Sequence, residues 1–578
     1  MRINKVKGFT LIELLAVIII LAIIAFISTS LILSVIKNAQ PKSKETGALG
    51  LIEAANNYYA KSLTSPATYP INPTTSILNN LSYTGEKPEE YTDIGYGVYL
   101  NSNKEVALAV SYSGTCYQKG YKDTTIRTFI YDSSTCVALS RTESTLNGAD
   151  PTYEKGLIPI VYDEITASPT YRKWVKADIY STTNTWYDYA NKKWANAVMV
   201  TNAKRNAYVA AAPGTEILEA DILAYLVWIP RYEYKYTEMV VANAISINFI
   251  SKTTTTPSDA ANYKVHPAFT FGDEELSGIW VGKFETTGTG NSPTVKPNLV
   301  ALGTQDISTE FKTSQKFNTY GLGSSNDAHM MKDSEWGAAA YISHSVYGIC
   351  TNQTTCSEIY INNSSNFITG RSGGAVGGST ARVSTQYPTS GSTSHNRFYD
   401  YGYYTYDGKI VEYGGAINAY SSTITLGTKA STTGNIYGIY DMSGGTWENL
   451  MGVYSSVAYN NGYPGYSGDS AAYNSGYNGW LSTDNIIKTD GKSWPTNKYY
   501  EIFTSASSAI ACSGGICYGY ALSETASWYN DDASMVTESY PWLCRGGSYS
   551  DSTFSGLFSF NASRGYAYSV FSFRLVVS

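Results

Sequence analysis

The sequence predicts an α+β protein in which one long apolar N-terminal helix is followed by a small antiparallel sheet and a large, irregular head. An apolar run extends over residues 14–36 and is broken only by hydroxyl side chains. Glycine and tyrosine, with 50 and 52 of the 578 residues, favour short strands and long loops over further long helices. Residues 141–156 are polar with Gly and Pro, which predicts a linker.

Charge and length limit the function classes. Charged residues make up 15% of the chain and the net charge is −6. No basic patch indicates a nucleic-acid partner, so none is expected for the head. A chain of 578 residues is long enough for roughly three to four domains.

The N-terminal segment has the features of a membrane anchor. Residues 1–7 are basic, and the apolar run of 23 residues is long enough to span a hydrocarbon core. The basic residues favour a cytoplasmic N-terminus, and the run is too long for an ordinary secretory signal. Between them lies Gly8-Phe9-Thr10-Leu11-Ile12-Glu13. A carboxylate at the lip of a membrane span is costly and usually functional.

This arrangement resembles a type IV prepilin leader. The resemblance implies that a prepilin peptidase cuts between Gly8 and Phe9 and that Phe9 is then methylated. Glu13 would neutralise the new amine of a neighbouring pilin subunit, an ion pair that is favourable only when both partners are present. Residues 1–8 would be the leader of a single-pass precursor in the cytoplasmic membrane of a bacterium, which later joins an extracellular filament or the cell surface. The alternative is a plain one-span anchor.

Residues 9–140 are predicted to form a pilin module. Its helix covers about residues 9–62 and bends at Pro41, where a backbone hydrogen bond is lost. Five apolar residues beyond the bend share one helix face: Leu51, Ile52, Ala55, Tyr58 and Tyr59. Alternation and turn residues predict a hairpin over residues 95–110, and residues 125–131 form a further strand.

The seven cysteines are spaced mostly as close pairs. In an exported protein such pairs predict local disulfides rather than metal clusters. The candidate pairs are Cys116 with Cys136, Cys350 with Cys356, and Cys512 with Cys517. Cys544 is left without an assigned role.

Residues 157–220 are predicted to form a small aromatic-rich β module. Its aromatic residues include Trp174, Trp186 and Trp194. These rings form either a sugar-binding platform or the core of a small sheet. A large domain is expected over residues 221–578, and the Ser/Thr/Gly-rich residues 370–434 within it predict long loops.

Four separated pieces of this head resemble the formylglycine-generating-enzyme (sulfatase-modifying factor) family. The pieces are residues 280–287 (WVGKFETT), 333–339 (DSEWGAA), 438–448 (GIYDMSGGTWE) and 545–549 (RGGSY), the last followed by Arg564 and Phe573-Arg574. The resemblance implies an irregular α+β head related to the C-type lectin fold.

The family's oxidase chemistry is not expected here. Its two copper-binding cysteines correspond to Asp551 and Gly556, which cannot supply soft thiolate ligands, so we expect neither copper nor enzyme activity. The family also binds calcium near its Trp-Glu signature, where Gly445 replaces the expected Asn and Glu448 remains. Calcium prefers several oxygen ligands. Two interpretations stay open: a calcium site at Glu448, or a buried structural cluster of Trp447 and Glu448.

The C-terminal segment, residues 549–572, interleaves Tyr, Ser, Gly and Phe as antibody paratopes do. The candidate ligand-binding residues are Tyr549, Asp551, Phe554, Phe558, Phe560, Asn561, Tyr566, Tyr568 and Phe571. The alternative is that they are ordinary core and turn residues. The segment also resembles the variable proteins of diversity-generating retroelements, which carry mutable residues before a closing Phe-Arg on the same fold.

The sequence therefore predicts a minor type IV pilin-like subunit that displays a non-catalytic, lectin-like head for adhesion. The expected ligand is a surface glycan or protein, and the size of the head favours a sparse subunit. Two alternatives stay open. One is a pseudopilin of a type II-like secretion or DNA-uptake apparatus, and the other is a surface enzyme with a relocated active site.

Overall fold

The chain divides into two compact units, residues 1–141 and 142–578. The computed structural model describes, with short internal gaps, residues 44–136, 156–359, 403–412, 430–454, 486–503 and 517–578. Most of the predicted linker, residues 141–156, lies outside the described residues. Residues 1–43, with the predicted leader, Gly8, Phe9, Glu13 and the apolar run, lie outside the described residues. Among the helices that are described, none has the length and apolar character needed to cross a membrane.

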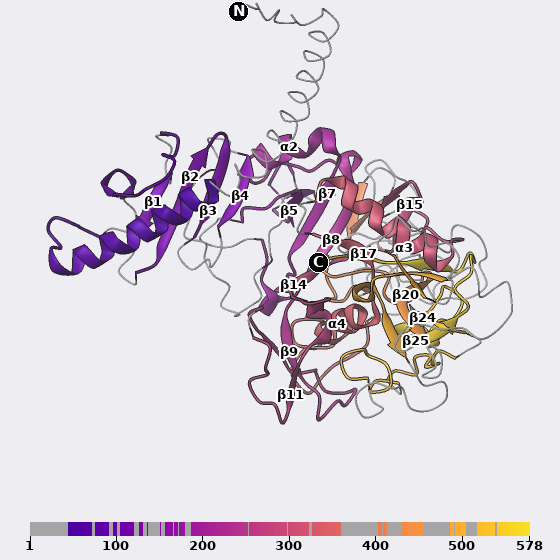
Figure 1. Ribbon diagram of the computed structural model, residues 1–578. Helices are drawn as coiled ribbons and strands as arrows, with labels where there is room; N and C mark the ends of the chain where they lie inside the picture. The colour runs from indigo at the N-terminus through magenta and orange to yellow at the C-terminus, as the bar shows by residue number, and fades with distance from the viewer. Residues whose placement is uncertain are drawn as a thin grey trace, which may run out of the picture. The chain divides into compact units, whose positions relative to one another are not determined.

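The first unit packs a helix onto a four-stranded antiparallel sheet (Figure 1). The helix covers described residues 44–64, and Leu51, Ala55 and Tyr58 on its predicted face are buried against the strands. The sheet has the order β1-β2-β3-β4, with β1 Gly97–Leu100, β2 Val106–Tyr112, β3 Thr115–Lys119 and β4 Arg127–Ile130. The predicted hairpin and the predicted later strand are confirmed as β1–β2 and β4.

The second unit is built on a seven-stranded antiparallel sheet with the order β17-β27-β14-β8-β7-β5-β6 (Figure 1). Its strands are β5 Leu157–Tyr162, β6 Trp174–Lys176, β7 Asn196–Val200, β8 Ile222–Pro230, β14 Gly278–Gly282, β17 Ala328–Met330 and β27 Leu575–Val577. The C-terminal strand β27 lies between β14 and β17, so the end of the chain is held between two strands near one edge of this sheet.

Residues 157–220 are part of this head and not a module of their own. Strand β7 pairs with β8, which carries β5 and β6 into the same sheet as β14. The rings of Trp174, Trp186 and Trp194 are buried in the core that the whole sheet shares. A sugar-binding platform made of these rings is therefore wrong, and the core alternative is correct.

A second sheet has the order β23-β20-β24-β25, and β26 also pairs with β20. Its strands are β20 Trp447–Tyr454, β23 Glu501–Phe503, β24 Trp542–Gly546, β25 Gly556–Ser563 and β26 Phe571–Phe573. The pairs β20–β23 and β20–β26 are parallel, whereas β20–β24 and β24–β25 are antiparallel.

The remaining described elements are short. The helices are α2 Asn202–Ala210, α3 Ile307–Gln315 and α4 Asp333–Ser343. The strands are β9 Tyr232–Lys235, β10 Ile247–Phe249, β11 Tyr263–Val265, β12 Thr270–Phe271, β13 Glu274–Glu275, β15 Thr287–Thr289, β16 Ser292–Thr294, β18 Tyr403–Tyr406, β19 Lys409–Glu412, β21 Ile486–Thr489 and β22 Lys492–Pro495. The predicted α+β class is confirmed, with far more strands than helices. Most of the predicted loop region 370–434 lies outside the described residues.

Candidate ligand-binding site of the head

A buried arginine near the C-terminus joins three of the four sequence pieces. Arg574 lies between β26 and β27, and its Nε donates to Glu448 Oε2 at 2.8 Å, while Nη2 bonds the other carboxylate oxygen. Its Nη1 donates to the carbonyl of Gly282 at 2.8 Å. Arg574 and Glu448 are fully buried. Removing one partner of such a pair leaves an uncompensated buried charge, so the pair holds β14, β20 and the C-terminus together.

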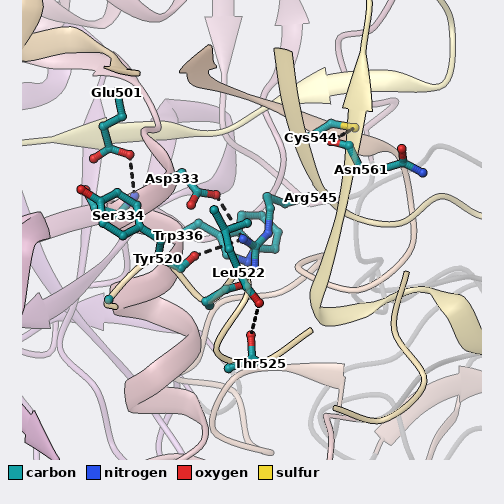
Figure 2. Close-up of polar contacts among 12 residues, drawn as sticks. Asp333, Ser334, Trp336, Glu501, Tyr520, Leu522, Thr525, Cys544, Arg545 and Asn561 are labelled. Atoms are coloured by element: carbon teal, nitrogen blue, oxygen red, sulfur yellow. Dashed lines mark hydrogen bonds and ion pairs between the residues drawn. The ribbon is translucent and has the colours of Figure 1, made fainter. Parts of the chain in front are cut away.

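A second buried arginine, Arg545, contacts the remaining sequence piece, residues 333–339 (Figure 2). Arg545 on β24 donates to Asp333 Oδ1 at the start of α4 at 3.1 Å and to the carbonyls of Tyr520 and Ala521 at 3.1 and 2.8 Å. Its guanidinium also lies over the ring of Trp336, 5.5 Å from the centroid. All four pieces therefore meet in one buried polar frame, although the first and the last of them lie more than 250 residues apart.

The first and third pieces also contact each other directly. Lys283 Nζ donates to the carbonyls of Ile436 and Gly438 at 2.6 and 2.9 Å, and burial lowers the pKa of this amine well below its usual value. The Glu285 Oε1 atom accepts from the backbone N–H and the hydroxyl of Thr446 at 2.8 and 2.7 Å. These bonds fix the segment of residues 445–447, which ends at the first residue of β20.

Steric crowding explains why glycine occupies position 445, three residues before Glu448. Gly445 has a φ of +78°, and a Cβ at this position would lie 2.9 Å from Glu285 Oε1. Both oxygens of Glu448 are bound by Arg574, so this carboxylate is committed to an ion pair. The geometry therefore supports the buried structural cluster over the calcium site at Glu448.

Two turns flank the segment of residues 445–447 and carry exposed aromatic side chains: the first turn is residues 547–555, between β24 and β25, and the second is residues 564–570, between β25 and β26. The N–H of Tyr549 donates to Gly445 O at 2.9 Å, and the N–H of Trp447 donates to Val570 O at 2.9 Å. The second turn is also held by Thr304, whose N–H donates to Tyr568 O at 3.2 Å. Backbone bonds to the buried frame therefore position both turns.

The second turn and the first residue of β26 present a row of three rings, which we call the aromatic row: Tyr566, Tyr568 and Phe571. The centroids of Tyr566 and Tyr568 are 6.4 Å apart, and those of Tyr568 and Phe571 are 6.3 Å apart. Tyr566 and Tyr568 are 39% and 51% exposed, and Phe571 is half-buried. Phe554 on the first turn is 54% exposed, and Tyr549 is half-buried.

Two of the predicted ligand-binding residues are core residues instead. Phe558 and Phe560 on β25 are 1% and 2% exposed. Phe558 packs on Trp528 with 4.8 Å between centroids, because β25 is covered by the loop of residues 528–534. Asn561 is half-buried, and its amide donates to Asp532 Oδ2. The paratope interpretation is therefore wrong for Phe558 and Phe560.

Asp551 and Gly556 each have a structural role in this part of the head. Asp551 Oδ2 accepts from the N–H of Ser548 at 2.7 Å and stabilises the first turn. A Cβ at Gly556 would lie 2.1 Å from Asp531 Oδ1, so only glycine fits against this buried carboxyl group. Asp531 Oδ2 in turn accepts from the N–H of Phe558 at 2.9 Å.

The cysteine predictions have three outcomes. Disulfides join Cys116 to Cys136 and Cys350 to Cys356. Cys517 is also disulfide-bonded, but Cys512, its predicted partner, lies outside the described residues. Cys544 is a free, buried thiol whose Sγ donates to Asn561 O at 3.3 Å (Figure 2).

Sequence reasoning missed two features beside the second disulfide. A ring nitrogen of His344 and the sulfurs of Cys350 and Cys356 all lie within 4.8 Å of one another. His344 comes only six residues before Cys350, and this spacing is the sequence signal of the cluster. A pocket of about 350 Å³ lies next to the disulfide loop, lined by Gln353 and by polar residues that include Lys235, Asn243 and Tyr263.

The comparisons with known proteins concern the N-terminus. The family model for the prokaryotic N-terminal methylation motif matches residues 3–29. No curated protein matches the chain. The motif fits a pilin-like or pseudopilin-type subunit made as a membrane-anchored precursor, which a prepilin peptidase processes. The chain therefore has a prepilin-like N-terminus.

Proposed function

We propose that this protein is a minor type IV pilin-like subunit whose non-catalytic, lectin-like head binds a surface glycan or protein through the aromatic row. The observation that carries the proposal is the row itself, exposed on a backbone-anchored turn of a chain that begins with a methylation motif. The proposed cleavage lies between Gly8 and Phe9. Glu13 then pairs with the amine of a neighbouring subunit in an extracellular filament or at the cell surface.

The chemistry of the aromatic row suits ligand binding. Tyrosine and phenylalanine offer large contact areas at a low cost in conformational entropy, and the tyrosine hydroxyls add hydrogen bonds. Flat rings can stack on the apolar face of a sugar or pack into a protein surface. Because the turn is bonded to the segment of residues 445–447, little ordering is left to be done on binding.

The buried frame supports the lectin-like assignment of the head. The resemblance rests on four pieces in a fixed order, and the pairs Arg574–Glu448 and Arg545–Asp333 bring those pieces together. Asp551 and Gly556, which stand where the family's enzyme has its copper ligands, support a head without oxidase activity. A fold does not by itself determine a function, so the binding proposal depends on the exposed row.

The test is binding by the full-length chain, in detergent, to a panel of glycans and surface proteins. We expect saturable binding that Tyr566→Ala and Tyr568→Ala together weaken by about 30-fold. Aromatic side chains that become buried at an interface contribute about 2 kcal/mol or more to the binding free energy. Tyr91→Ala is the matched control, since Tyr91 is an exposed tyrosine of the first unit. Binding that survives the double substitution would contradict the role of the row. A folded chain that binds nothing on the panel would favour the pseudopilin alternative.

A further inference from the structure

His344, Cys350 and Cys356 form a preassembled set of metal-ligating side chains away from the aromatic row. A ring nitrogen of His344 and both sulfurs lie within 4.8 Å of one another, and His344 and Cys350 are buried. His344 Nε2 bonds the carbonyl of Val241 at 3.1 Å. Its Nδ1 is buried and has no hydrogen-bond partner among the described residues. A histidine whose second nitrogen is held by a backbone carbonyl is the usual arrangement of a metal ligand.

The backbone holds these three residues together independently of the sulfur–sulfur bond. The N–H of Ile245 donates to His344 O at 2.8 Å, and the N–H of Cys356 donates to Ala242 O at 3.1 Å. Lys192 Nζ donates to Cys350 O at 2.9 Å. The same short segment, residues 241–245, therefore holds both the histidine and the cysteine loop. The two thiols would stay beside His344 when the disulfide is absent.

We propose that the dithiol form of Cys350 and Cys356 binds one Zn²⁺ ion together with His344. Each thiol loses its proton as its sulfur bonds to the metal, so one Zn²⁺ displaces two protons and no electrons are transferred. Two thiolates and one imidazole are ligands that zinc prefers, and they leave a fourth tetrahedral position open to water. The disulfide and the metal are then mutually exclusive ways of closing the loop of residues 350–356.

Whether zinc or the disulfide closes the loop should depend on the cell compartment, which rests on the proposed export of the head. Thiols stay reduced in the cytoplasm, where the chain is made, and disulfides persist outside the membrane. Zinc would therefore close the loop before export. Outside the membrane a thiol oxidant, such as the disulfide of an oxidoreductase, would take two electrons from the two thiolates, which forms the disulfide and releases Zn²⁺. Metal binding by the purified chain does not depend on adhesion or on filament assembly, so its outcome is separate from that of the proposed function.

The experiment uses the full-length chain in detergent, reduced with a phosphine and kept free of oxygen. Co²⁺ is the spectroscopic probe, because tetrahedral thiolate sites give a charge-transfer band with this ion. We expect the band to saturate at one Co²⁺ per chain and Zn²⁺ to abolish it. It should be absent from the oxidised protein and from Cys350→Ser, Cys356→Ser and His344→Gln. The glutamine amide can keep the bond to Val241 while the second ring nitrogen is lost.

Two controls make the result specific. Cys544→Ser removes a buried thiol elsewhere in the head and should leave the band unchanged. In the wild-type chain, Zn²⁺ should protect Cys350 and Cys356 from alkylation, measured by mass spectrometry, without protecting Cys116 and Cys136. This second measurement needs no variant to fold. A reduced chain that keeps its circular dichroism spectrum but gives no band, or a band that survives in His344→Gln, would overturn the proposal.

Discussion

At the residue scale, the most telling side chain is a buried histidine between two carboxylates. His329 Nε2 contacts Glu335 Oε1 at 3.0 Å, and Nδ1 lies 3.7 Å from Asp327 Oδ1. Burial opposes a positive charge on this ring, but the two carboxylates outweigh it and raise the pKa of His329 to about 9. The imidazolium is therefore a stabilising charge of the folded head.

This raised pKa predicts a stability that depends on pH. The contribution of His329 is complete below pH 6.5, the usual pKa of histidine, and is lost as the pH rises through 9, since the unfolded chain then binds fewer protons than the folded one. The loss amounts to about 3 kcal/mol of unfolding free energy. Denaturant titrations at pH 6 and pH 9.5 measure it, and His329→Gln should reduce the difference between the two pH values by about this amount.

A second histidine provides the control for this measurement. Burial lowers the pKa of His266 to about 3, so its ring stays neutral over the whole range. His266→Asn retains an acceptor for the N–H of Ala268 and should leave the slope unchanged. An equal pH dependence in the wild type and in His329→Gln would contradict the assignment.

The Arg574–Glu448 ion pair predicts that replacing the Glu448 carboxylate by an amide strongly lowers the unfolding free energy. Glu448→Gln leaves Arg574 buried without its counter-charge, which should cost about 3–5 kcal/mol of unfolding free energy. Replacing both residues, as Glu448→Leu with Arg574→Met, should recover most of this loss. Glu310→Gln is the matched control, because burial raises the pKa of Glu310 and the amide resembles its neutral form. Thermal melts compare the wild type, Glu448→Gln, the double variant and Glu310→Gln. Equal melting temperatures for Glu448→Gln and Glu310→Gln would contradict a structural role for the ion pair.

At the element scale, strands and turns were predictable where their signals are local. The β1–β2 hairpin follows from alternating apolar residues around a polar turn. Strand β3 was missed because its connection to β2 is Ser113-Gly114, which lacks the usual Asn-Gly or Asp-Gly signature. Both residues have a positive φ, as a two-residue hairpin turn of this type requires. The local pattern of β25 gave no sign that both of its faces are covered.

The structure sharpens the retroelement hypothesis for residues 549–572 into a prediction about positions. If this gene is diversified, substitutions should gather at exposed or half-buried sites such as Tyr549, Asp551, Tyr566 and Tyr568. Phe558 and Phe560 should stay apolar, because a cavity there would cost about 3–5 kcal/mol. Sequencing this gene in related strains, together with any near-copy beside a reverse transcriptase, measures the distribution. Equal variation at buried and exposed positions would contradict the hypothesis.

At the scale of the whole molecule, the sheet of the head begins at β5 and not at residue 221. Strand β7 pairs with β8 along its length and carries β5 and β6 with it. A chain cut at residue 221 would lose all three strands and expose the edge of β8 and the core that Trp186 and Trp194 fill. Unpaired apolar edges of this kind promote aggregation.

The corresponding prediction concerns two truncated chains. Residues 142–578 should give a soluble, cooperatively melting protein, whereas residues 221–578 should aggregate or lack a thermal transition. Size-exclusion chromatography and circular dichroism compare the two. A soluble, folded product from residues 221–578 would mean that β5–β7 add little to the stability of the sheet.

The sequence by itself determined the features that depend on near neighbours. These are the prepilin-like N-terminus, the apolar face of the first helix, the β1–β2 hairpin and the Cys350–Cys356 disulfide loop, because each depends on residues that are close together along the chain. Only the tertiary structure decided which aromatic residues of the head are exposed, that Glu448 belongs to Arg574, and that His344 lies against two sulfurs. Burial and pairing depend on segments that are distant along the chain, and composition cannot report on that packing.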